Sequence, residues 1–308
     1  MYGPKLSRKS FLQLAGGTAL SALSGQHAWA TPATMRTKLI PVSGEALPVV
    51  GLGTSRVFDI GGRESERAPR REVLKLLLQA GGTVIDSSPM YGEAEEVVGD
   101  LLRDISFTPK PFVATKVWTE GRQDGIEQMA KSARLLRTPK IDLIQIHNLV
   151  DWRTHLKTLR RMKEEGTIRY IGITHYTDWG QAELAAIIGS NQFDFVQTEY
   201  AIDTRKAEER LLPLARDKGT AVIINRPFQR GSLFRAVRGE KLPLWAADFQ
   251  CQSWGQYFLK FVLSHPSVTC AIPGTSKPKH MRDNVQAGLG RLPTEKERKK
   301  MVAYLENL

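Results

Sequence analysis

The sequence predicts a (β/α)8 TIM barrel, because short apolar runs alternate with longer segments of helical period. Eight runs of strand length are apolar at their centres, and segments long enough for a helix separate them. Strands that are apolar throughout are typical of parallel sheets buried on both faces, and eight such units close into a barrel. A doubly wound open sheet is disfavoured, since no G-x-G-x-x-G turn follows the first strand and polar residues end most strands.

The elements are expected in a simple order. A hairpin from Leu39 to Val50, turning at Ser43-Gly44, would close the bottom of the barrel. The eight strands are expected at Val49 to Thr54, Thr83 to Ser87, Phe112 to Val117, Leu143 to His147, Tyr170 to Thr174, Phe195 to Glu199, Ala221 to Asn225 and Thr269 to Ile272. The helices are centred near Leu76, Val98, Ala130, Leu159, Leu184, Leu211 and Phe258. Two further segments, Arg56 to Arg70 and Gln229 to Gln250, follow strand ends and are expected to overhang the active face as loops.

Residues 1–30 have the pattern of a signal peptide, so residues 31–308 are expected to form the single domain. A basic start is followed by a mildly apolar stretch and by Ala28-Trp29-Ala30, which suits cleavage. Ser7 to Leu12 resembles a twin-arginine export motif with Lys9 in the second basic place. We therefore expect export to the periplasm by the twin-arginine machinery. An uncleaved membrane anchor is the alternative, but the apolar run is short for one.

The composition is that of an ordinary globular protein, with 41% hydrophobic and 25% charged residues. The formal net charge of +12 falls to about +9 without the leader. This excess is scattered, and no basic stripe interleaved with aromatic residues points to nucleic acid. No metal-ligand spacing is present, so no metal is expected. Cys251 and Cys270 are expected to be buried thiols, although an oxidising compartment would permit a bridge.

Four reactive side chains stand at or just after the ends of successive strands. Asp86 ends one strand, Tyr91 follows it in Pro-Met-Tyr-Gly, and Lys116 and His147 come at the ends of the next two. A phenol is a weak acid at neutral pH unless a cation stabilises the phenolate, and an ammonium held by a carboxylate supplies one. We expect Lys116 to lower the pKa of Tyr91. Alone, each residue has a structural explanation, such as an ion pair or a packing tyrosine.

These segments resemble the catalytic segments of the aldo-keto reductases. The matching pieces run from about residue 37 to residue 290, and they are Gly51 to Thr54, Ile85 to Ser88, Tyr91-Gly92, Thr115-Lys116, Ile146 to Asn148, Val196-Gln197, Ile272 to Thr275 and Asp283-Asn284. The resemblance implies reduction of an aldehyde or ketone by a hydride from a nicotinamide cofactor. Tyr91 would donate the proton, Asp86 would hold the lysine, and His147 would orient the carbonyl beside Trp118 in the substrate pocket.

The resemblance also assigns residues to the cofactor. These are Gly53, Thr54, Ser55, Asp86, Thr174, His175, Gln197, Asn225, Arg226, Pro227, Phe228, Ser232, Ile272, Gly274, Thr275, Ser276, Lys277, His280, Asp283 and Asn284. The chain departs from the family at several of them. Thr174-His175 replaces Ser-Asn, and Asn225 replaces a tyrosine that stacks on the nicotinamide, a task that Arg226 or Phe228 would have to take over. Hydroxyls and a lysine at a helix start favour a phosphate, so NADPH is preferred over NADH.

The expected function is therefore NADPH-dependent reduction of a small-molecule carbonyl by a monomer. Two alternatives remain open at this point. One is a regulatory barrel subunit that binds NADP(H) without turnover. The other is an oxidoreductase that recycles a tightly bound nucleotide between two substrates, which would suit a compartment poor in reduced nicotinamide.

Overall fold

The computed structural model describes residues 34–308 except Ser106 and Pro109, and these residues form one compact unit. The predicted signal peptide and its export motif lie outside the described residues. Within the described part of the chain, no helix is both long enough and apolar enough to cross a membrane.

Eight parallel strands form a closed barrel, as predicted. In chain order they are β3 (Leu52–Gly53), β4 (Val84–Asp86), β5 (Phe112–Val117), β6 (Ile141–His147), β7 (Ile168–Thr174), β8 (Phe195–Glu199), β9 (Ala221–Asn225) and β10 (Cys270–Ala271). Each strand pairs with the next in the sequence. The ring closes where the Gly51 N–H donates to the Ala271 carbonyl and the Ala271 N–H donates to the Val49 carbonyl, both at 2.9 Å. The carboxyl ends of all eight strands therefore meet at one end of the barrel.

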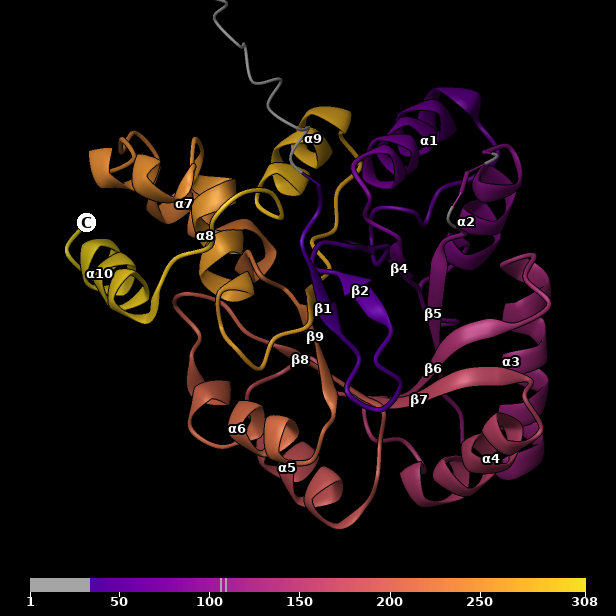
Figure 1. Ribbon diagram of the computed structural model, residues 1–308. Coiled ribbons are helices and arrows are strands. Elements are labelled where there is room, and N and C mark those ends of the chain that lie inside the picture. Colours follow the sequence, from indigo (N-terminus) through magenta and orange to yellow (C-terminus); the bar gives the residue numbers. More distant parts are fainter. Residues whose placement is uncertain (1–33, 106, 109) are drawn as a thin grey trace, which may run out of the picture. The chain divides into compact units, whose positions relative to one another are not determined.

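Helices surround the ring of strands (Figure 1). They are α1 (Glu64–Gln79), α2 (Ala94–Arg103), α3 (Arg122–Leu135), α4 (Trp152–Glu164), α5 (Gln181–Ser190), α6 (Leu211–Asp217), α7 (Ser232–Ala236), α8 (Trp254–Leu263), α9 (Pro278–Gln286) and α10 (Glu295–Glu306). The expectation of two plain loops was wrong. Acidic Glu64 and Glu66 start α1 inside the first segment. The second contains α7 and two short 3₁₀ turns, and Leu211 begins α6 instead of standing at its centre.

The predicted hairpin consists of β1 (Thr37–Leu39) and β2 (Ala46–Pro48), which pair antiparallel. Gly44 takes φ 71° at the turn, a left-handed conformation that glycine adopts without strain. Ile40 and Leu47 are fully buried in one apolar cluster with residues near the amino ends of the barrel strands, including Val84 and Phe195. The hairpin therefore closes the amino end of the barrel and leaves the carboxyl end for the reactive residues (Figure 1).

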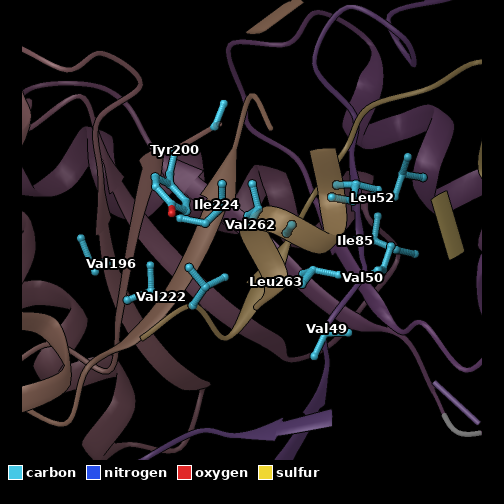
Figure 2. Close-up of a cluster of buried hydrophobic side chains, with 14 of the residues drawn as sticks. Val49, Val50, Leu52, Ile85, Val196, Tyr200, Val222, Ile224, Val262 and Leu263 are labelled. Carbon is cyan, nitrogen blue, oxygen red and sulfur yellow. The ribbon is translucent and has the colours of Figure 1, made fainter. Parts of the chain in front are cut away.

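A second apolar cluster fills the layer between the strands and the helices. Val262 and Leu263 of α8 belong to it together with Val50 and Ile224 from the strand layer (Figure 2). Cys251 and Cys270 are both free and buried, and burial raises the pKa of the Cys251 thiol to about 11. This packing holds the strands rigidly, so their carboxyl ends present side chains at fixed positions.

Candidate active site

A buried ion pair lies at the carboxyl end of β4 and β5. The Lys116 ammonium donates to Oδ2 of Asp86 and to the carbonyl of Ser87, each at 2.6 Å. The two side chains are only 1% and 3% exposed. Burial lowers the pKa of Lys116, but the Asp86 carboxylate and the Tyr91 phenol outweigh it and leave the pKa raised. A cation is therefore fixed inside the mouth of the barrel.

Tyr91 lies beside this cation. The Lys116 ammonium is 5.1 Å from the centre of the Tyr91 ring. Burial raises the pKa of the phenol, and the charge of Lys116 opposes that effect without overcoming it. Lys116 thus lowers the pKa of Tyr91 as expected, but desolvation raises that pKa by more, so the net pKa lies above its usual value. The phenol keeps its proton at neutral pH and is suited to donate it.

His147 completes the set from the end of β6. Its ring meets the Tyr91 ring edge-on, with the ring centres 5.9 Å apart. Nδ1 lies 3.0 Å from the hydroxyl oxygen of Ser88. Burial and the nearby Lys116 charge lower the pKa of His147 to about 2, so the imidazole is neutral. The structure therefore brings all four predicted reactive residues together.

Gln145 on β6 joins this group and was not predicted. Its amide donates to Oδ1 of Asp86 at 2.8 Å, and Gln197 donates to the same oxygen at 3.0 Å. Gln197 also donates to the Gln145 carbonyl oxygen at 3.2 Å. Gly172 on the neighbouring strand leaves room, since a Cβ there would lie 2.9 Å from the Gln145 side chain. A glutamine between two isoleucines in the middle of a strand was the available signal.

Gln197 and Asn225 form a partly satisfied amide pair in the nicotinamide region. The Gln197 carbonyl oxygen accepts only long contacts, from Thr174 and from Asn225, both at 3.4 Å. Oδ1 of Asn225 is buried and has no hydrogen-bond partner among the described residues. A buried acceptor of this kind is costly unless a donor reaches it. The residues thus fit a ligand amide such as the carboxamide of a nicotinamide.

His175 does not join that amide pair. Its Nδ1 lies 3.0 Å from the Thr177 hydroxyl and accepts the Thr177 N–H at 3.3 Å. Gly180 makes space for the ring, because a Cβ there would lie 2.2 Å from Nδ1. The imidazole is therefore held by the segment that precedes α5.

Arg226 and Phe228 both contact other side chains of the protein. The Arg226 guanidinium lies 4.3 Å from the centre of the Tyr176 ring and 3.6 Å from the Glu199 carboxylate. The Phe228 ring lies 5.0 Å from that of Phe234. Neither side chain can stack on a nicotinamide, as the resemblance would require, without leaving these contacts.

The residues predicted to bind the adenosine part of the cofactor lie in α9 or just before it. The Thr275 hydroxyl accepts the Lys277 N–H at 3.1 Å, which fixes the turn into the helix. Lys277, Lys279 and His280 stand at the start of α9, and burial, followed by the charges of the two lysines, lowers the pKa of His280. The Asp283 carboxylate is held by Ser253 and Gln256 of the α8 start, at 2.7–2.8 Å. It therefore anchors two helices, a role that the sequence did not indicate.

Most of the remaining predicted residues lie at the carboxyl end of the barrel. Gly53 and Gly274 approach closely, since a Cβ on Gly274 would lie 3.0 Å from the Gly53 carbonyl. Others follow strand ends or begin helices, and they are Thr54, Ser55, Pro227, Ser232, Ile272 and Ser276, whereas Asn284 is buried in the last turn of α9. Trp118 follows β5 and is 42% exposed, while Gln128 holds its backbone through two hydrogen bonds. Trp118 therefore lies at the carboxyl end of the barrel, partly exposed, and its contact with a substrate stays a prediction.

Comparisons with known proteins agree with this geometry. The sequence profile described as the Aldo/keto reductase family matches residues 49–301. The chain is 30% identical to methylglyoxal reductase YeaE of Escherichia coli strain K12 over 81% of this chain and 89% of that protein. The chain belongs to the aldo/keto reductase family. The predicted enzyme class, an oxidoreductase acting on carbonyl groups, is confirmed with it.

Two further similarities place this reductase among its relatives. It is 25% identical to human aflatoxin B1 aldehyde reductase member 4, over 76% of this chain and 77% of that protein. Two crystal structures of a Klebsiella pneumoniae aldo/keto reductase, one with NADP and acetate and one with NADPH, have the same fold at a TM-score of 0.73. Each is 22% identical and covers 88% of this chain and 95% of the other.

Proposed function

We propose that this reductase converts an aldehyde or ketone to an alcohol with NADPH, and that Tyr91 donates the proton. The observation that carries the proposal is the buried Asp86–Lys116 pair beneath a protonated phenol. A carboxylate and an ammonium held this firmly next to a proton donor serve little purpose in packing. They do serve a reaction in which negative charge develops on an oxygen.

Each of the four residues has its own role in the proposed reaction. His147 is neutral and donates a hydrogen bond to the substrate carbonyl oxygen. Tyr91 transfers its proton to that oxygen as the alkoxide develops, and the Lys116 ammonium stabilises the phenolate that remains. Asp86 keeps the lysine in place. When bound, the nicotinamide supplies the hydride that the protein itself lacks.

Two groups of residues support NADPH as the cofactor. Gln197 and Asn225 would hold the carboxamide, since each has an acceptor oxygen that lacks a strong donor. Lys277, Lys279 and His280 cluster at the start of α9, where positive charge and the helix dipole favour a phosphate. The Klebsiella relatives crystallised with NADP and NADPH are consistent with this choice.

Exposed apolar residues at the carboxyl end of the barrel bear on the substrate class. Met90, Trp118, Tyr176 and Trp179 follow β4, β5 and β7, and Trp179 is 67% exposed. Two similar proteins are named as reductases, one of methylglyoxal and one of an aflatoxin B1 aldehyde. We propose reactive aldehydes, including small dicarbonyls, as the substrate class.

We also propose that residues 1–30 direct export to the periplasm, on the strength of the sequence pattern described above. A tightly retained nucleotide, recycled between two substrates, would then sustain turnover where reduced nicotinamide is scarce. Purification of the mature protein from the periplasm tests both ideas. Recovery of the protein in the cytoplasm with its leader intact would rule out export, and a nucleotide-free periplasmic protein would rule out retention.

The test of catalysis compares wild type with Tyr91→Phe. We expect NADPH oxidation with methylglyoxal and with an aromatic aldehyde to fall by about 10²–10⁴-fold, because the general acid is lost. Titration of tryptophan fluorescence should show unchanged NADPH binding and weaker NADH binding in both proteins. Equal rates in the two proteins, with NADPH still bound, would favour a regulatory barrel subunit over an enzyme.

A further inference from the structure

We propose that Ser88 is a positioning residue whose hydroxyl donates to Nδ1 of His147 and thereby keeps the imidazole proton on Nε2. The proposal rests on the function proposed above, since Nε2–H is then the group that binds the carbonyl oxygen. The Ser88 oxygen lies 3.0 Å from Nδ1. Ser88 is fully buried and His147 is 4% exposed, so water does not compete freely for this contact.

The direction of this hydrogen bond follows from what else contacts Ser88. The Met90 N–H donates to the Ser88 oxygen in a long contact of 3.4 Å. Among the described residues, Nδ1 is the one acceptor recorded for the Ser88 hydroxyl proton. If Nδ1 carried the imidazole proton, the hydroxyl proton would be buried without an acceptor, which costs roughly 1–3 kcal/mol. The arrangement with Nδ1 as acceptor is therefore favoured.

The tautomer matters because the imidazole is neutral. Burial and the charge of Lys116 lower the pKa of His147 to about 2, so the ring carries one proton at neutral pH. A neutral imidazole donates from one nitrogen only. With Nδ1 turned to Ser88, the proton on Nε2 is the one available to a substrate, and the edge-on contact with Tyr91 restrains the ring.

The tautomer can be read directly and without turnover. Histidine is labelled with ¹⁵N, and long-range ¹H–¹⁵N correlations identify the protonated nitrogen, with His147→Gln assigning the signal. We expect Nε2–H alone in the wild type and a mixture of tautomers in Ser88→Ala. A wild type protonated on Nδ1, or a Ser88→Ala variant that keeps Nε2–H alone, would overturn the proposal. Because the readout needs no substrate, the proposal can fail while carbonyl reduction stands, and the reverse.

Kinetics give the second readout. Ser88→Ala should lower kcat about tenfold, the value of one ordinary hydrogen bond, with the Kd for NADPH unchanged. Ser88→Cys keeps a donor at this position, although a weaker and larger one, and its kcat should lie between those of the wild type and Ser88→Ala. It also decides the matter should Ser88→Ala fail to fold in a thermal melt, since wild-type kcat and tautomer in Ser88→Cys would then contradict the proposal.

A matched control is Ser267→Ala. Ser267 is also a buried serine, but it precedes β10 at the amino end of the barrel and its hydroxyl has no partner among the described residues. We expect its kcat and His147 tautomer to equal those of the wild type. An equal loss in both serine variants would show a general effect of removing buried hydroxyls and would overturn the assignment to Ser88.

Discussion

The proton-transfer group and the carboxamide site share Gln197 but differ in how completely their hydrogen bonds are made. Asp86 accepts from Lys116, Gln145 and Gln197 at 2.6, 2.8 and 3.0 Å. In the carboxamide site the contacts are 3.4 Å long, and Oδ1 of Asn225 has no partner among the described residues. The hydrogen bonds of the proton-transfer group are complete before any ligand binds, whereas Asn225 depends on a ligand for its missing donor.

Charge explains the difference. A buried ion costs several kcal/mol unless it is paired, so Asp86 and Lys116 need each other at all times. An unpaired neutral amide oxygen costs about 1–3 kcal/mol, which the fold can tolerate until the ligand arrives. Three predictions test this contrast, in decreasing order of expected effect.

The largest effect is expected for Lys116→Met. The substitution removes the cation beside Tyr91, so kcat should fall about 10³-fold, within the usual range for acid–base groups. It also leaves the Asp86 carboxylate buried without its cation, which should lower the free energy of unfolding by about 3–5 kcal/mol. Steady-state kinetics and denaturant unfolding measure the two effects separately.

The double variant Asp86→Asn with Lys116→Met is the control for that experiment. With both charges gone, most of the lost stability should return, because no isolated ion remains buried. The activity should stay as low as in Lys116→Met. If activity returned together with stability, the lysine would be needed for folding and not for proton transfer.

Much of this arrangement was predictable from the sequence, because strand ends in a barrel converge by topology. The bounds of β5, β8 and β9 were right, since each begins with apolar residues that include strand-favouring Phe, Val or Ile. The direction of the net shift in the Tyr91 pKa was not predictable, because it depends on how deeply the phenol is buried. The position of His175 depends on the space left by Gly180, and no single residue reveals such a fit.

The second prediction concerns pH and His147. The pKa of His147 is about 2 in the folded protein and 6.5 in an unfolded chain. Below pH about 6.5 the unfolded chain takes up a proton that the folded protein does not, so stability is lost as the pH falls. The loss is at most about 1.4 kcal/mol per pH unit, or about 2 kcal/mol at pH 5 relative to neutral pH. His147→Gln should remove this part of the pH dependence.

Denaturant unfolding of both proteins at pH 5 and pH 7 measures that difference. His265 provides the control, because burial lowers its pKa to about 4 and it titrates in both proteins. The variant should therefore keep a smaller pH dependence of the same sign. Identical pH slopes would mean that His147 is solvated enough to take up its proton, and the proton-transfer group would not be set in advance.

The smallest effect is expected for Asn225→Ala. Removal of the unpaired oxygen relieves its desolvation cost while the smaller side chain loses packing, so the free energy of unfolding of the ligand-free protein should change by less than about 1 kcal/mol. The Kd for NADPH should rise about tenfold, because the carboxamide loses one hydrogen bond. Asn191→Ala, at the end of α5, is the control and should leave the Kd unchanged. An unchanged Kd in Asn225→Ala would mean that Oδ1 receives no donor from the cofactor. The contrast between the complete hydrogen bonds of Asp86 and the incomplete ones of Asn225 would then have no functional meaning.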